Sequence, residues 1–281
     1  MNKIGLAIQL KEDIVAFEAQ LKKAQELGFE FVQIALWDMK KLNKEGAQET
    51  KALLDKYNLK STELWCGWIR PAEWNFVDGP STLGLVPTEY RQARLQNLID
   101  AADFAETLGV TDIITHLGFI PTNPYDSDYV GVVQALKFLL KGYKDRGLFF
   151  CLETGQETPV IARRLIEDTK ADNFGVNYDP ANLILYGSAN PVDGLDILAP
   201  FVRQIHVKDG TYPTNGYEIG KETALYDGSV NIDAFFAKLA SLNFEGSLVI
   251  ENEMRACSEE ERWGHVVNAK KTCEDFVASK K

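Results

Sequence analysis

The amino-acid sequence predicts a single closed (β/α)8 TIM barrel. Short apolar runs alternate with longer amphipathic runs from one end of the 281-residue chain to the other, which gives eight strand-then-helix units. Because no two strands follow each other directly, the strands are expected to pair in parallel through helical crossovers. Eight such units in about 280 residues is the number that closes a barrel. An open doubly wound sheet is the alternative, but it predicts a glycine-rich motif after the first strand, and AIQLKED contains no glycine.

The expected elements follow in order along the chain. The strands are short apolar runs at 3–8, 30–36, 60–66, 111–116, 148–153, 174–179, 202–207 and 247–251. Several helices end with Gly or Asn just past the last apolar helical position, as in ELGFEF, TLGVTD, DRGLFF and LNFEGS. The helices are expected at 13–27, 45–57, 88–108, 128–145, 157–170, 193–199, 231–242 and 258–279. No linker or low-complexity stretch separates these units, so residues 1–281 are expected to form one domain.

Two of the loops that follow strands are unusually long. Residues 67–87 follow the third strand and residues 208–230 follow the seventh, and both loops are rich in aromatic residues and glycine. In a TIM barrel such loops rise over the C-terminal face, where active sites are built. We therefore expect these two loops to contribute to function, with a decorative insertion as the alternative.

Composition and charge exclude several classes of partner and point to a compartment. The chain has 30 Lys and Arg against 41 Asp and Glu, a net charge of −11, so neither nucleic acid nor an anionic membrane is expected as a partner. No apolar run is long enough for a signal sequence or a spanning helix. The four cysteines form no C-x-x-C pair, which favours reduced thiols and a cytoplasmic protein. A homodimer and a homotetramer are both compatible with the sequence.

Four successive strands end in a side chain that can bind a metal ion. Glu153, Asp179, His206 and Glu251 are separated by 26, 27 and 45 residues, which corresponds to one repeat, one repeat, and one repeat plus a long loop. Consecutive parallel strands are neighbours, so the four side chains are expected to gather on one side of the barrel mouth. Three carboxylates crowded there repel each other unless a cation neutralises them. Three carboxylates and one imidazole suit a divalent ion, for which we expect Mn²⁺, with Mg²⁺, Co²⁺ and Zn²⁺ as alternatives.

The segments that carry these residues resemble a known family. LETGQET, GVNYDPANL, QIHVKDG and LVIENE are similar to segments of the xylose isomerase-like TIM barrels, in particular the sugar (phosphate) isomerase/epimerase group with its ketose 3-epimerases and inosose dehydratases. The resemblance covers essentially the whole chain. It implies that Glu153, Asp179, His206 and Glu251 hold one divalent metal. It also implies that Glu153 and Glu251 act as the catalytic acid/base pair.

The expected reaction is isomerisation or epimerisation next to a ketone of a ketose, keto-sugar or sugar phosphate. A proton is removed from carbon and returned through an enediolate, which a metal ion stabilises as a Lewis acid. One base on each face of the sugar permits epimerisation. The strands that carry Glu153 and Glu251 flank the metal, so these two carboxylates can serve both as ligands and as opposed bases.

Five further residues are candidates for contact with the substrate. Asn182 stands where several family members have His, and Lys208 stands in for an Arg that many ketose epimerases carry after the seventh strand, because no Arg lies between Arg203 and Arg255. An ion pair of Lys208 with Asp209 or Glu251 is its alternative role. The candidates for substrate binding are Lys208, His116, Asn182, Trp68 and Arg255, with Trp68 as the preferred lid residue among the aromatic side chains of this region.

Three other functions remain open at this point. A metal-dependent lyase or dehydratase acting on a keto-inositol or 3-keto-glycoside begins with the same proton removal. A DNA-repair hydrolase related to endonuclease IV needs about three metals and many His ligands, and this chain has only three His. A non-catalytic sugar-binding barrel is the third alternative, and it predicts binding without exchange of substrate protons.

Overall fold

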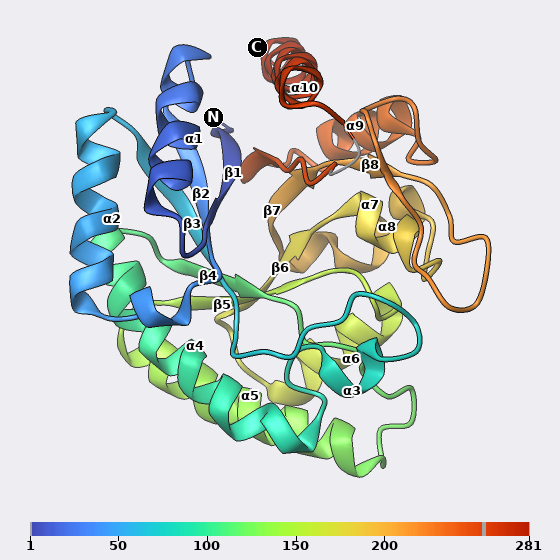
Figure 1. The fold of residues 1–281 in the computed structure, drawn as a ribbon. Helices are drawn as coiled ribbons and strands as arrows, with labels where there is room; N and C mark the ends of the chain where they lie inside the picture. The colour runs from blue at the N-terminus through green and yellow to red at the C-terminus, as the bar shows by residue number, and fades with distance from the viewer. Residues whose placement is uncertain (1, 255–256, 281) are drawn as a thin grey trace.

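The protein folds as a (β/α)8 TIM barrel. The computed structural model describes residues 2–254 and 257–280, and in it eight parallel strands close in the order β1-β10-β7-β6-β5-β4-β3-β2. The barrel closes between its first and last strands, where Ile4 pairs with Leu248. Figure 1 shows the helices around the outside of the strands. The predicted fold class is confirmed.

All eight predicted strands form, with ends shifted by a few residues. The last one is predicted to include Glu251 but stops at Ile250, so Glu251 is the first residue past the strand. The barrel strands are β1 (Ile4–Leu10), β2 (Phe31–Leu36), β3 (Lys60–Cys66), β4 (Asp112–Thr115), β5 (Phe149–Glu153), β6 (Phe174–Tyr178), β7 (Val202–Val207) and β10 (Ser247–Ile250).

All eight predicted helices form as well, and local capping explains several of their ends. The Asp13 carboxylate accepts two backbone N–H groups at the start of the first helix, and Ser258 and Glu261 form a capping box at the start of the last. The helices are α1 (Ile14–Glu26), α2 (Lys44–Lys56), α4 (Thr88–Leu108), α5 (Ser127–Asp145), α6 (Pro159–Thr169), α8 (Pro191–Leu198), α9 (Ile232–Ser241) and α10 (Glu259–Ser279).

Short elements in the loops are absent from the sequence prediction. Each is too short to show a periodic pattern. The helix after β6, for example, has six residues and begins because Asp179 caps it and proline occupies its first position. These elements are α3 (Gly79–Thr82), α7 (Pro180–Leu185), the 3₁₀ turns Met39–Lys41 and Ala199–Phe201, and the two-stranded β8 (Asp209–Gly210) and β9 (Glu222–Thr223).

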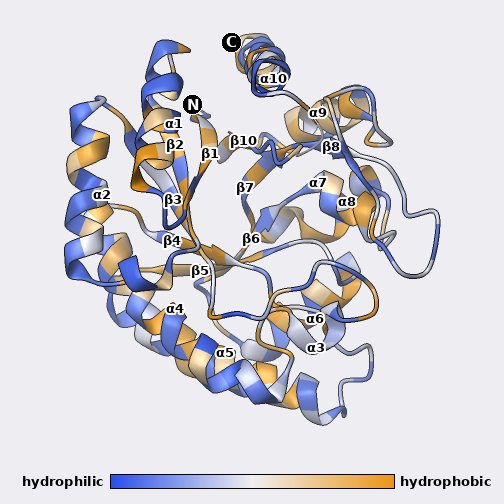
Figure 2. Cartoon of the chain, in the orientation of Figure 1, coloured by the Kyte–Doolittle hydropathy of each residue, from blue (hydrophilic) through white to orange (hydrophobic). Residues whose placement is uncertain are grey.

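The main hydrophobic core lies between the strands and the surrounding helices. Outward-facing strand residues such as Leu6 and Ile8 are buried against helical residues such as Phe17 and Val266. Figure 2 shows hydrophilic and hydrophobic residues interleaved along the outer helices, as expected for helices with one face on the core. No described helix meets the length and hydrophobicity needed to cross a bilayer.

The two long loops meet above the C-terminal ends of the strands. The backbone N–H of Phe76 donates to the carbonyl of Tyr217 (3.0 Å), so the loop after β3 and the loop after β7 are joined. Within the second loop, the Asp209 carboxylate accepts the backbone N–H groups of Gly210, Tyr226, Gly228 and Val230. The loops therefore cover the barrel mouth as predicted, and Asp209 organises one of them.

Candidate active site

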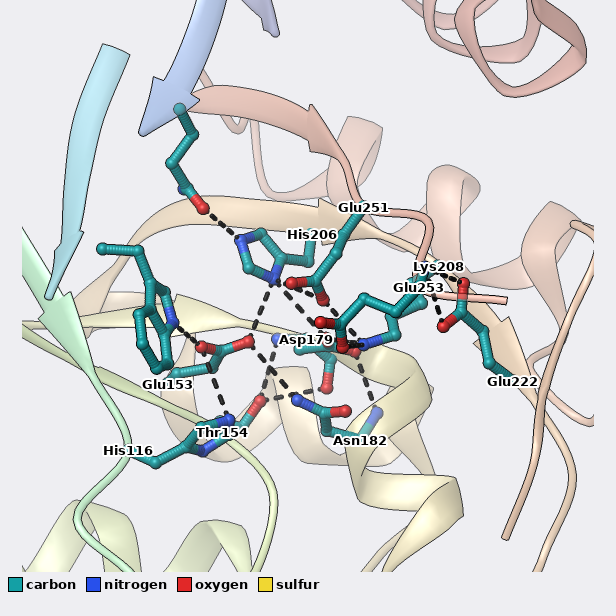
Figure 3. Close-up of polar contacts among 12 residues, drawn as sticks. His116, Glu153, Thr154, Asp179, Asn182, His206, Lys208, Glu222, Glu251 and Glu253 are labelled. Carbon is teal, nitrogen blue, oxygen red and sulfur yellow. Dashed lines mark hydrogen bonds and ion pairs between the residues drawn. The ribbon is translucent and has the colours of Figure 1, made fainter. Parts of the chain in front are cut away.

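The structure brings together the four residues predicted to bind a metal. Each of Glu153, Asp179, His206 and Glu251 offers one ligand atom, and these atoms all lie within 4.8 Å of one another. Figure 3 shows the four side chains pointing toward a common centre. The side chains converge because β5, β6, β7 and β10 are successive strands of the barrel and each residue lies at or just after the strand end.

His206 lies at the centre of the three carboxylates. Its Nδ1 atom is 3.0 Å from Oε1 of Glu153, 3.5 Å from Oδ2 of Asp179 and 3.4 Å from Oε2 of Glu251. Glu153, Asp179 and His206 are at most 1% exposed, so solvent does little to screen their charges. This arrangement places three like charges in a buried site around one ring nitrogen.

The donor set fits a divalent cation. Although both are buried, Nδ1 of His206 and Oδ2 of Asp179 have no hydrogen-bond partner among the described residues. Buried polar atoms are seldom left without a partner, and a cation at the centre of the cluster would satisfy both. Carboxylate oxygens and one imidazole nitrogen are ligands of hard to borderline divalent ions. These four residues could therefore hold a metal ion.

Electrostatics in the cluster favour positive charge at its centre. Burial lowers the pKa of His206, but the charges of Glu251 and Glu153 outweigh burial and hold it well above its usual value. Burial raises the pKa of Glu153, yet the neighbouring His116 and His206 bring it below the ordinary value. Glu153 thus stays ionised and attracts a cation.

Backbone and side-chain contacts fix the orientation of the acids. Oγ1 of Thr154 accepts the backbone N–H of Asp179 (2.8 Å), and Oδ1 of Asp179 caps α7 through the N–H of Asn182 (2.9 Å). The indole N–H of Trp65 donates to Oε2 of Glu153. Nδ2 of Asn182 donates to Oε1 of Glu153 at 3.3 Å. Asn182 therefore contacts a ligand carboxylate as well as facing the cavity.

Gln33 orients the imidazole of His206. Its Nε2 donates to Oε2 of Glu63 (3.3 Å), which leaves its Oε1 to accept from Nε2 of His206 (2.9 Å). In the neutral imidazole the hydrogen therefore stays on Nε2, and Nδ1 presents its lone pair to the centre of the cluster. Gln33 was not among the predicted site residues, although a glutamine inside the apolar run FVQIAL is a signal that could have found it.

A buried lysine lies beside Glu251. Nζ of Lys208 is 2.6 Å from Oε2 of Glu251 and 3.7 Å from Oδ2 of Asp179. Of the two ion pairs considered for Lys208, the one with Glu251 forms, and Asp209 turns to the backbone of its own loop. Two further acids near Lys208 were not predicted: Glu253 (3.7 Å from Nζ) and Glu222, whose pKa burial raises to about 8.

A cavity of about 750 Å³ opens above the cluster. Its volume lies within the range of roughly 300–1,000 Å³ that small-molecule sites occupy. His116, whose Nε2 is 3.5 Å from Oε2 of Glu153, lines it together with Asn182 and Lys208. The aromatic wall consists of Trp37, Trp65, Trp74 and Tyr186.

Two predicted substrate contacts are not placed at this cavity. Trp68 is 4% exposed and packs behind the wall, with its ring 5.4 Å from that of Trp37 and 6.0 Å from those of Trp65 and Trp74. The expectation of a Trp68 lid is therefore corrected: its tryptophan neighbours line the cavity and it supports them. Arg255 lies outside the described residues.

We predict that Gln33→Leu weakens metal binding by about 10- to 100-fold, because loss of an outer-shell partner of a ligating histidine has an effect of that size. Titration calorimetry with Mn²⁺ measures the Kd, and ¹⁵N NMR of the metal-free protein reports the tautomer of His206. Gln9→Leu is the matched control, since Gln9 is a glutamine that lines the cavity above the cluster but bonds to Glu253 rather than to one of the four cluster residues. Equal Mn²⁺ affinity in Gln33→Leu and wild type would refute the positioning role.

Comparison with known proteins agrees with this geometry. The family described as xylose isomerase-like TIM barrel matches residues 21–272. Among solved structures, a xylose isomerase domain protein from Planctomyces limnophilus is 30% identical, with a TM-score of 0.89 and coverage of 98% of this chain and 97% of that chain. A D-tagatose 3-epimerase-like protein is 18% identical, with a TM-score of 0.74 and coverage of 99% and 98%. The probable 3-DHS dehydratase AsbF from Bacillus anthracis is 15% identical, with a TM-score of 0.68 and coverage of 97% and 98%. The last two show the shared fold, and the match over most of the sequence shows that the chain belongs to the xylose isomerase-like TIM barrel family.

Proposed function

We propose that the protein is a divalent-metal-dependent isomerase or epimerase that acts next to the ketone of a ketose, keto-sugar or sugar phosphate. The observation that carries the proposal is the convergence of Glu153 and Glu251 on the same buried centre from strands on either side of β6 and β7. Such a pair presents a carboxylate to each side of a substrate carbon, which is the arrangement that two-base proton transfer requires.

In the proposed reaction, one of the two carboxylates removes a proton from the carbon next to the ketone. The electron pair of the broken C–H bond moves toward the carbonyl oxygen and gives an enediolate. A proton returned to the opposite face of the same carbon gives the epimer. A proton returned to the former carbonyl carbon gives the isomer, once the hydroxyl proton of the neighbouring carbon has moved to the enediolate oxygen. A divalent ion bound by Glu153, Asp179, His206 and Glu251 would supply Lewis-acid stabilisation of the negative charge.

The surrounding residues of the chain prepare the two bases. Trp65 and Asn182 hold Glu153 in place, and Lys208 holds Glu251. The joined loops rise beside the cavity, and displacement of water by a bound substrate would strengthen the electrostatic interactions inside it. Trp65, Trp74 and His116 offer an aromatic surface for the apolar face of a sugar ring.

A lyase or dehydratase is the second candidate, and the position of Lys208 favours it. The buried ammonium lies 2.6 Å from Glu251 and lines the cavity, so it could donate a proton to a departing β-oxygen after the same first step. The products separate the two candidates: an epimer or aldose indicates an isomerase, and an unsaturated product indicates a lyase.

The test is a panel of ketoses, ketose phosphates and keto-inositols incubated with the protein and Mn²⁺ in D₂O. Mass spectrometry reports which substrate takes up deuterium from solvent, and NMR identifies the product. We expect at least one member to exchange a single C–H next to its ketone. Binding of a sugar without any exchange would instead indicate a non-catalytic barrel.

A further inference from the structure

A second cavity adjoins the catalytic one. It has a volume of about 560 Å³ and lies between α1 and α10 over the end of β1, the strand that these two helices flank in Figure 1. The two cavities adjoin each other, because five residues line both. The shared residues are Gln9, Lys11, Ala35, Glu251 and Glu253. Glu251 borders both spaces, and a molecule that spans them would pass the hydrogen-bonded side chains of Gln9 and Glu253 at their boundary.

The lining of the second cavity suits a hydroxylated group. Phe17 and Val266 form a buried apolar floor, and half-buried Trp263 offers an indole whose N–H donates to Glu259 (3.3 Å). The Nε atom of Arg262 is buried and has no hydrogen-bond partner among the described residues. An aromatic face beside donors and acceptors of hydrogen bonds is the combination that a sugar ring needs, with its apolar C–H face and its rim of hydroxyls.

The charges of this lining disfavour an anionic ligand. Four carboxylates line the cavity against two cations, so a phosphate would meet net repulsion whereas neutral hydroxyls can donate to the carboxylates. The carboxylates belong to Asp13, Glu251, Glu253 and Glu259, and the cations to Lys11 and Arg262.

We propose that the substrate is a neutral keto-sugar glycoside. Its keto-sugar ring lies beside Glu153 and Glu251, and its second sugar, or another hydroxylated substituent of similar size, lies between α1 and α10. This inference rests on the proposed function and narrows its substrate class: a single unsubstituted sugar leaves the second cavity unused, and a sugar phosphate is disfavoured.

The test fills the second cavity without touching the first. Ala19 is an exposed residue of α1 that lines only the second cavity, so Ala19→Trp places an indole in it at little cost to the fold. Ala52→Trp is the matched control, because Ala52 is an exposed residue of α2 that lines neither cavity. The probes are a hexos-3-ulose, its methyl glycoside and its glucosyl glycoside, measured as kcat/KM for deuterium uptake and as Kd by calorimetry with Mn²⁺.

In wild type and Ala52→Trp, kcat/KM for the glucosyl glycoside is expected to exceed kcat/KM for the methyl glycoside by about tenfold or more. Such a ratio corresponds to the additional contacts of the second sugar. Ala19→Trp is expected to reduce this ratio to about one and to leave the methyl glycoside unaffected. A ratio near one in wild type, or a ratio that survives Ala19→Trp, overturns the inference.

The controls separate a failure of the glycoside proposal from a failure of the proposed isomerase or epimerase function. If no probe takes up deuterium, the catalytic proposal fails for this substrate class, and the Kd ratio alone then decides whether the second cavity binds a sugar. Light scattering of wild type and Ala19→Trp measures the oligomeric state of each protein. A change in oligomeric state in Ala19→Trp would show that the space between α1 and α10 is an interface between copies of the chain, and would overturn the inference.

Discussion

Glu153→Gln and Glu251→Gln are each expected to abolish exchange of the substrate C–H with solvent, with a fall in rate of at least about 10²- to 10⁴-fold, the usual contribution of a positioned general base. Glutamine keeps the size of the side chain but cannot accept the proton. The substitution also removes one negative charge from the cluster around Nδ1 of His206. The rate of deuterium uptake in D₂O, measured by mass spectrometry, reports the effect.

Two controls separate loss of the base from loss of the fold or of the metal. Circular dichroism and the melting temperature show whether each variant folds, and the metal content after dialysis against Mn²⁺ shows whether the cluster still holds an ion. Glu73→Gln is the matched substitution, since Glu73 is an exposed glutamate at the same cavity but outside the cluster. Exchange at the wild-type rate in either cluster variant would exclude that glutamate as a base.

The four-residue cluster could be predicted from sequence because residues at the ends of successive barrel strands lie next to one another in space. Glu153, Asp179, His206 and Glu251 end successive strands, and the ends of successive parallel strands form one continuous rim. The same reasoning places Lys208 in the mouth, since it lies two residues after His206 and so on the same face. The sequence left the ion-pair partner of Lys208 open between Asp209 and Glu251, because the partner depends on where the Asp209 loop turns.

The remaining residues of the site escaped prediction for physical reasons. Gln33 contacts His206 across the barrel interior. Such contacts depend on the stagger of the strands, and no periodic pattern in the sequence indicates that stagger. Glu222 comes from a short strand within a long loop. Trp68 was chosen from a group of tryptophans in which it touches the other three, and only the packing decides which of them face the cavity.

Removal of divalent metal is expected to lower the stability of the protein as well as its activity. A cation that binds only the folded state at a concentration of 100 times its Kd stabilises that state by about 2.7 kcal/mol. For a chain of this size that corresponds to a rise in melting temperature of roughly 5–10 °C. Thermal unfolding of chelator-treated protein, with and without added Mn²⁺, measures the shift. Mg²⁺, Co²⁺ and Zn²⁺ tested in parallel rank the ions.

The ligand variants decide whether this stabilisation arises at the cluster. Asp179→Asn and His206→Ala are expected to lose the Mn²⁺-dependent shift, because each removes one of the two buried atoms without a hydrogen-bond partner. Asp179→Asn can keep the cap on α7, since an asparagine side-chain oxygen also accepts the N–H of Asn182. The metal-free melting temperature of Asp179→Asn reports a balance, because the variant relieves repulsion with Glu153 and Glu251 but weakens the ion pairs of Asp179 with His206 (3.5 Å) and Lys208 (3.7 Å). A full Mn²⁺-dependent shift in both variants would place the ion elsewhere and would remove the basis for assigning these four residues to it.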